Sequence, residues 1–155
     1  IVSWKNRLWA LSNDPSQLDR ILYTDDGLPY RWGNEIAAYP EGQELHGIIA
    51  MAPRKDQLGV MKRSGLWQIT GDSNLSFRII QIAFNGRGGC ISERSVVTIN
   101  DEAFWQGPDG VNNWGSSGVT SITDLNVRPW FLSDRYFNRD EFANSFAKFN
   151  LLRDQ

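Results

Sequence analysis

The sequence has little of what most catalytic and metal-binding sites need. Cys90 is the only cysteine and His46 the only histidine among its 155 residues. A lone cysteine forms no internal disulfide, and neither residue stands in a zinc-ligand spacing. Because most triads and many metal sites use histidine, His46 alone would have to carry such chemistry. The sequence therefore argues against an enzyme, and it predicts no catalytic residue, no cofactor and no metal ligand.

Long apolar runs and basic runs are also missing. No stretch approaches the ~20 apolar residues of a transmembrane helix. The 16 Lys and Arg nearly balance the 18 Asp and Glu, for a net charge of −2. A protein that grips the phosphate backbone usually carries a basic stripe. We therefore expect no membrane span and no specific binding of nucleic acid.

Aromatic residues, in contrast, are abundant, with 7 Trp, 8 Phe and 4 Tyr. Each of them buries a large area on few rotatable bonds, which suits a core between sheets. The apolar runs are short and bounded by Asn, Asp, Pro and Gly, as in strands and hairpins. We predict an all-β chain with Trp9, Trp67 and Trp105 in its core. A sugar-stacking platform of exposed tryptophans is the alternative.

Two stretches of the chain repeat one plan of strands and turns. Gly65 and Gly110, each in a turn, lie 45 residues apart and align the two stretches. Four short antiparallel strands per ~40–50 residues are typical of a β-propeller blade. The predicted strands are 47–52, 58–61, 66–70 and 77–82 in one stretch, and 95–99, 103–105, 111–114 and 119–122 in the other.

The first part of the chain follows the same plan with a longer internal loop. We predict three blades, over about 1–38, 46–84 and 90–127, joined by polar crossovers. Such sheets cannot bury both faces alone and must stack. Three blades are too few for a closed propeller of ~4–8, and the chain opens within a predicted strand. We therefore expect residues 1–155 to form one propeller-like region of a longer polypeptide.

A change of pattern after Pro129 predicts a short C-terminal helix over about 138–149. Asn138 followed by Glu141 fits a capping box. Phe142, Phe146 and Phe149 then fall on one helical face, so we expect this helix to dock on the sheets as a clip.

Each candidate for chemistry has a structural interpretation that the sequence favours. His46 lies in a predicted linker, and Cys90 is expected to be a buried thiol at a strand edge. Asp25-Asp26-Gly27 is the stretch nearest to a calcium loop, but it lacks the series of oxygen ligands. Gly86-Arg87-Gly88-Gly89 lacks the Lys-Ser/Thr of a phosphate loop. The remaining aspartates that we assign to turns are Asp14, Asp72, Asp101 and Asp109. A hydrolase on a propeller scaffold would need His46 or paired carboxylates, and no motif places a nucleophile beside them.

The amino-acid sequence of the predicted third blade resembles a repeat in virion proteins of tailed bacteriophages. The resemblance is carried by Gly-Cys-Ile-Ser-Glu-Arg-Ser-Val-Val at 89–97 and by Pro-Asp-Gly-Val at 108–111. Segments 62–71, 6–9 and 22–25 are similar to other parts of that repeat, so the resemblance runs from about Asn6 to Phe142. One departure is Asn112-Asn113, which stands where the family has an aromatic residue.

The resemblance implies β-propeller domains of tail tube, nozzle, hub or adaptor proteins, built into multimeric rings. On that basis we expect a structural protein of the phage tail, located in the virion. Its partners would be other tail proteins and copies of itself, with DNA passing through a lumen and a host receptor as further contacts. The alternative is a propeller binding module that recognises a host glycan or a protein surface.

Overall fold

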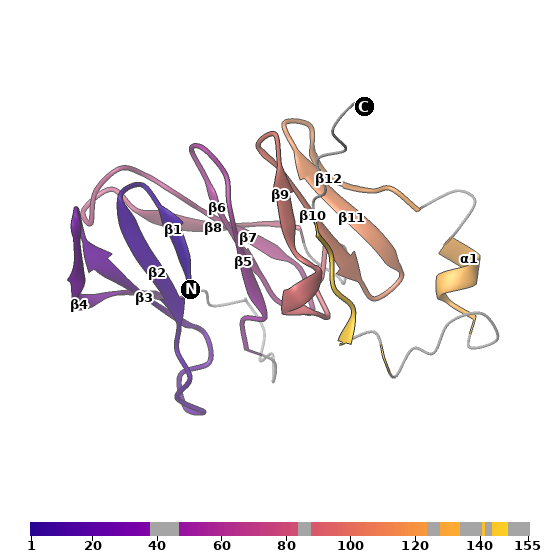
Figure 1. Cartoon of the computed structure of the whole chain (residues 1–155), viewed down its shortest axis with the longest axis horizontal. Coiled ribbons are helices and arrows are strands. Elements are labelled where there is room, and N and C mark those ends of the chain that lie inside the picture. Colours follow the sequence, from indigo (N-terminus) through magenta and orange to yellow (C-terminus); the bar gives the residue numbers. More distant parts are fainter. Residues whose placement is uncertain (38–46, 84–87, 124–127, 134–140, 142–143, 149–155) are drawn as a thin grey trace, which may run out of the picture.

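The computed structural model describes residues 1–37, 47–83, 88–123, 128–133, 141 and 144–148, and its strands form three antiparallel four-stranded sheets side by side (Figure 1). The strands of each sheet follow chain order. Sheet A holds β1 (Val2–Trp4), β2 (Arg7–Leu11), β3 (Arg20–Asp25) and β4 (Leu28–Ala37). Sheet B holds β5 (Ala50–Pro53), β6 (Leu58–Met61), β7 (Leu66–Thr70) and β8 (Arg78–Ala83). Sheet C holds β9 (Val97–Ile99), β10 (Glu102–Gly107), β11 (Gly110–Gly115) and β12 (Gly118–Ser121). The predicted all-β class, with blade-like sheets, is confirmed.

Tight two-residue turns open sheets A and C. Lys5 and Asn6 have positive φ, and so do Asn100 and Asp101. Positive φ at both central residues is the requirement of a type I′ turn, whose twist matches that of the two strands it joins. The strands pair as Trp4 with Arg7 and as Ile99 with Glu102 on either side of these turns. Lys5 and Asn100 therefore occupy equivalent positions.

Sheet B is buried on both faces. We call the face of a sheet toward the next sheet in the chain its forward face, and the opposite one its rear face. Side chains alternate between faces along a strand, so Leu58 and Val60 point rearward to sheet A while Met61 points forward to sheet C. The core between sheets A and B contains Trp4, Trp9, Ile21, Tyr23, Met51, Leu58, Val60, Trp67 and Ile69. The core between sheets B and C contains Ala50, Ala52, Met61, Leu66, Ala83, Cys90, Ala103, Trp105 and Trp114.

The second core packs small residues against large ones. Sheet B presents Ala50, Ala52 and Gly59 to sheet C, which presents Trp105 and Trp114. A Cβ on Gly59 would lie 2.6 Å from Cζ3 of Trp114. Because a real Cβ does not approach an atom so closely, glycine is needed here for the indole to reach the strand. The large rings of one sheet thus fill the space that the small residues of its neighbour leave.

The 45-residue offset between sheets B and C is a structural equivalence. Met61 pairs with Leu66 in one sheet and Gln106 with Val111 in the other, each pair 45 residues from its counterpart. The facing is kept as well, because Val60 and its counterpart Trp105 both point rearward. The repeat predicted from Gly65 and Gly110 is confirmed in both register and facing.

The first strands of the three sheets lie next to one another. β1 contacts β5, and β5 contacts β9. These strands line a hollow of about 380 Å³ with Val2, Met51 and Val97 on its wall. In a propeller the first strand of each blade lies at the central axis, so the arrangement is compatible with propeller blades that do not close into a ring.

The C-terminal helix lies at a different place from the one predicted. The helix that the structure describes is α1 (Arg128–Phe131), and no helix in the described ranges has the length and hydropathy that crossing a membrane requires. Half of the expected helix, 138–149, lies outside the described residues, and 145–148 within it are not helical. Residues 145–147 nevertheless contact the segment just before sheet C, since the Ala147 N–H donates to Arg94 O at 2.9 Å.

The first strand of the third blade begins later than predicted. The expected strand started at Ser95, but Glu93–Ser95 form the 3₁₀ turn η1 and β9 starts at Val97. The Ser95 hydroxyl donates to Ser92 O at 2.7 Å, and its N–H donates to the same oxygen. Such local hydrogen bonds compete with strand pairing.

We predict that Gly59→Ala lowers the free energy of unfolding by about 1–3 kcal/mol, because the added methyl must displace the Trp114 ring in a filled core. Gly33→Ala is the matched control, since a Cβ there meets nothing within 4 Å. Urea denaturation of both variants measures the difference. Equal stabilities would contradict the close approach of Gly59 and Trp114.

Candidate functional site

The sequence candidates for chemistry do not converge on one place. His46 lies outside the described residues. Cys90 is fully buried in the core between sheets B and C, and its thiol donates to Ser92 O at 3.3 Å. Burial raises the pKa of the Cys90 thiol to about 11, and the polar surroundings of Ser92 and Ser95 oppose only part of the shift. A nucleophilic cysteine needs the opposite shift, so Cys90 is a core residue, as predicted.

Asp25 and Asp26 point to separate partners. Asp25 accepts a hydrogen bond from Asn34 Nδ2 at 2.8 Å, whereas Asp26 accepts one from Asn6 Nδ2 at 2.8 Å. Within the described ranges, no three His, Cys, Asp or Glu side chains group as a metal site would require. The turn interpretation of this stretch agrees with the structure.

The part of the glycine-rich linker that the structure describes serves packing. Gly88 has a φ of +71°, and a Cβ there would lie 3.0 Å from the Cβ of Ala83. The carbonyl of Gly89 accepts a hydrogen bond from Trp105 Nε1 at 3.0 Å. Residues 86 and 87 lie outside the described residues.

The tryptophans predicted in the core are buried. Trp9, Trp67 and Trp105 are at most 2% exposed. The indole N–H of Trp9 donates to Trp4 O at 3.1 Å. A buried polar group needs such a partner, so these rings are built into the core and offer no face to a sugar.

A residue that the sequence did not single out, Arg54, connects all three sheets. It lies in the β5–β6 turn of sheet B with its side chain only 10% exposed. Its Nε donates to Asp101 O at 2.6 Å and its Nη1 to Gly115 O at 3.3 Å, both in sheet C. Its own carbonyl accepts a hydrogen bond from Trp4 Nε1 of sheet A at 2.7 Å. We call this set of contacts the Arg54 clamp.

An aromatic ring and a carboxylate complete the Arg54 clamp. The guanidinium lies 4.6 Å from the ring centroid of Trp114, a cation–π distance. Asp101 also accepts the Lys55 N–H at 2.6 Å, so its carboxylate joins the β5–β6 turn to the β9–β10 turn. The hollow of about 280 Å³ beside this group is lined by Asp56, Gln68 and Ser116 among others. Because protein oxygens already take the donors of the guanidinium, the geometry is that of a clamp between sheets.

A second cation joins sheets A and B in the same way. Lys5 Nζ, in the β1–β2 turn, donates to Gly71 O at 2.9 Å and pairs with the Asp72 carboxylate. The same ammonium lies 5.2 Å from the Trp4 ring centroid. In both interfaces, a cation in the first turn of one sheet thus reaches the third-to-fourth strand turn of the next sheet. The sequence hides this device, because the partners lie 61 and 66 residues away.

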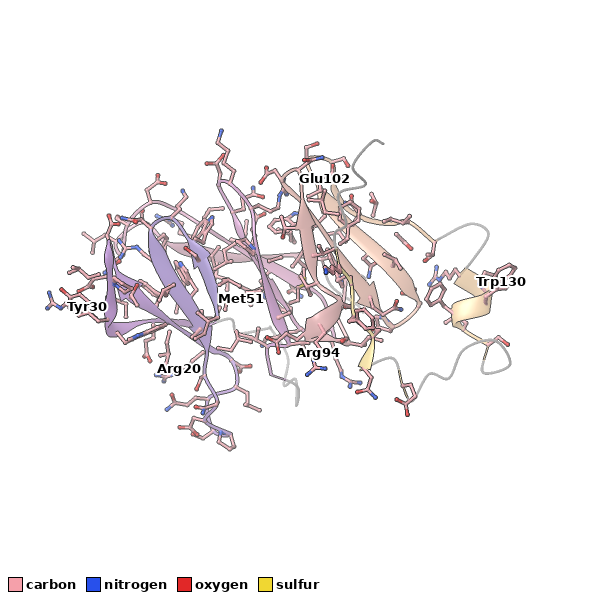
Figure 2. The ribbon with its side chains drawn as sticks, viewed as in Figure 1. Arg20, Tyr30, Met51, Arg94, Glu102 and Trp130 are labelled. Atoms are coloured by element: carbon pink, nitrogen blue, oxygen red, sulfur yellow. The ribbon has the colours of Figure 1, made fainter. Side chains whose placement is uncertain are left out.

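The exposed Tyr and Trp side chains of the described residues lie toward the two ends of the row of sheets. Tyr30 is 74% and Trp32 42% exposed, both on β4 at the edge of sheet A, and Trp130 of α1 is 54% exposed. Figure 2 shows Tyr30 and Trp130 at opposite ends of the molecule.

Comparison with known proteins finds no family model that matches this chain and no curated protein similar to it.

We predict that Arg54→Ala lowers the free energy of unfolding by about 2–3 kcal/mol, from lost charge-assisted hydrogen bonds to backbone oxygens and the lost cation–π contact. The free energy of unfolding of Arg54→Lys should lie between those of the unchanged chain and Arg54→Ala, because lysine keeps the charge but lacks the planar guanidinium. The control is Arg31→Ala, whose side chain is 65% exposed and 3.5 Å from Asp25, a pair worth at most ~1 kcal/mol. Chemical denaturation ranks the three, and equal losses for Arg54→Ala and Arg31→Ala would exclude the clamp.

The raised pKa of Cys90 gives a prediction with a definite sign. Above about pH 8.5 the thiol of the unfolded chain ionises, while the folded thiol stays protonated up to about pH 11. The unfolded state then binds fewer protons, so this residue makes stability fall as the pH rises through that window. Cys90→Ala should remove this part of the pH dependence, as measured by denaturation at pH 7 and pH 10. The native thiol should also react with a disulfide reagent at pH 8 far more slowly than the thiol in denaturant, and equal rates would contradict its burial.

Proposed function

We propose that this chain is a structural component of a bacteriophage tail, to which it contributes propeller blades within a multimeric assembly. The observation that carries the proposal is the resemblance of residues 89–97 and 108–111 to the virion repeat. The roles of these residues in the fold are consistent with it.

The motif residues act as parts of a joint between sheets. The N–H of Cys90 donates to Lys62 O at 2.9 Å, which ties the start of the third blade to the second. The Ser95 hydroxyl accepts the Gln106 N–H at 3.0 Å, and Ser92 Oγ donates to Ser145 O at 2.6 Å. A motif whose residues tie one blade to the previous one and brace its own sheet is what a repeat of structural units would be expected to keep.

The free faces of the row are the second support. Among the described residues, the two core clusters place sheets A and C each against a neighbour on one face, and the first strands of the sheets line a hollow. Sheets of this kind need neighbours on both sides. Further blades, from this polypeptide or from other tail subunits, would supply them in a ring.

A binding module is the second candidate, favoured by the exposed aromatic residues. Tyr30 and Trp32 stand on the outermost strand of sheet A, where a glycan or a protein surface has access to them. Aromatic side chains of this kind are common anchors of interfaces. The five tryptophans in the cores, Trp4, Trp9, Trp67, Trp105 and Trp114, are not available for such a role.

The proposal predicts that antibodies raised against this chain label the tail of purified phage particles in electron microscopy. Antibodies to a capsid protein serve as the control for position, and antibodies absorbed with the purified chain serve as the control for specificity. Mass spectrometry of the same particles should find several copies of the chain per particle. Labelling of the capsid alone, or absence of the chain from the particles, would refute the proposal.

A further inference from the structure

The two clamps of this chain join equivalent places. Lys5 of sheet A reaches Gly71 O, one residue after β7 ends, and Arg54 of sheet B reaches Gly115 O, the last residue of β11. β7 and β11 are the third strands of their sheets. Each internal interface therefore combines an apolar core with a cation that reaches from the first turn of one sheet to the end of the third strand of the next.

In sheet A, the corresponding turn between the third and fourth strands receives no cation from another sheet among the described residues. Its third strand, β3, ends at Asp25, and Asp26 follows in the turn. Arg31, of the same sheet, lies 3.5 Å from Asp25. Asp26 is exposed, and no Lys or Arg among the described residues lies within ion-pair distance of it. A carboxylate has about four acceptor sites, so the hydrogen bond from Asn6 leaves most of those on Asp26 open.

The rear face of sheet A is apolar next to this turn. Ala10 pairs with Leu22, and both point away from Trp9 and Tyr23, which face sheet B. Leu8 lies on the same rear face by alternation, and Leu22 is 38% exposed. The same face also carries the Arg20–Glu35 ion pair, because Glu35 is the partner of Leu22 on β4. Its apolar part is therefore the patch of Leu8, Ala10 and Leu22.

Sheet C of a second copy does not bring the missing cation. Its first turn carries Asn100 where sheet A carries Lys5, followed by Asp101 and Glu102. Next to Asp25 and Asp26 these groups would place like charges together, which disfavours the pairing. The forward face of sheet C is otherwise suitable, because Val97, Phe104 and Val111 point away from the core with sheet B.

We propose that the rear face of sheet A docks a further four-stranded sheet that carries a lysine or arginine in its first turn, and that Asp25 and Asp26 receive this cation. The occupant is a blade whose first turn carries a basic residue. An unchanged second copy of this chain does not fit, because the first turn of its sheet C is acidic. The inference rests on the proposal that further blades pack on this row, and it adds how the rear face of sheet A selects its neighbour. Association of the purified chain can be measured whether or not the chain is part of a phage tail.

The test gives this chain the missing cation. Asn100 is exposed at the position equivalent to Lys5, and lysine is compatible with its positive φ because Lys5 has the same one. We expect the Asn100→Lys variant to associate head to tail with a dissociation constant at least about tenfold lower than that of the unchanged chain, as measured by sedimentation equilibrium. The reason is that an attractive charge pair replaces a repulsion at the interface. The effect should weaken with added salt.

Matched controls separate this pairing from a general gain of charge. Ser117→Lys makes the same charge change in the other turn at the same end of sheet C, where the residue is also exposed, and it should leave association unchanged. Adding Asp25→Asn and Asp26→Asn to Asn100→Lys should reverse its effect. In the Asn100→Lys background, Leu22→Glu should abolish association. Leu75→Glu in the same background should not, because Leu75 lies in the β7–β8 loop and is 99% exposed. Circular dichroism checks that each variant is folded.

A zero-length carbodiimide cross-link gives an independent readout. In Asn100→Lys it should join the introduced lysine to Asp25 or Asp26 of another copy, as identified by mass spectrometry. The proposal fails if Asn100→Lys associates no more tightly than Ser117→Lys. It also fails if the unchanged chain already associates as tightly through the Leu22 face, since a cation would then not be needed.

Discussion

Burial of sheet B on both faces is the constraint on which the rest of this structure depends. A sheet with two apolar faces needs a neighbour on each side, and here the neighbours offer opposite shapes. Sheet A packs the bulky Trp9 and Tyr23 against the rear face of sheet B, which also carries large side chains. Sheet C packs Trp114 against Gly59 on the forward face of sheet B. The sequence thus varies side-chain volume from one interface to the next so that each core is filled.

The polar clamps follow from this packing. In both interfaces, the first turn of one sheet lies near the third-to-fourth strand turn of the next. Lys5 and Arg54 donate to backbone carbonyls at these places from the neighbouring sheet. Arg54 is also stacked on Trp114, so the charge outside the core and the aromatic ring inside it fix the same interface. A cation at each joint sets the order of sheets more specifically than an apolar face alone.

The strands and turns of this chain could be predicted because their signals are local. Lys5-Asn6 and Asn100-Asp101 mark their hairpins, and Gly65 with Gly110 reveals the repeat. The burial of Cys90 and of the strand tryptophans followed from the same pattern. The Arg54 clamp could not be predicted, because nothing in a turn shows which carbonyl 61 residues away it will meet. The start of β9 was missed because the side-chain hydrogen bonds of Ser95 override its strand propensity.

The degeneracy of the repeat has a physical reason at one pair of positions. The 45-residue offset relates Lys62 to Gly107 and Trp67 to Asn112. Lys62 is fully buried because the long β2–β3 loop of sheet A supplies Asp19, 2.8 Å from its Nζ, and Trp67 lies beneath the ammonium at 5.4 Å. The corresponding β6–β7 turn of sheet B is short, so no carboxylate reaches the third blade and a buried lysine there would lack a partner. The smaller pair occupies the place instead, with the Asn112 amide packed against Gly107 and its Nδ2 left without a hydrogen bond among the described residues. Sequence identity between the blades is lost where a neighbouring loop changes length, while the register and the facing of the strands are kept.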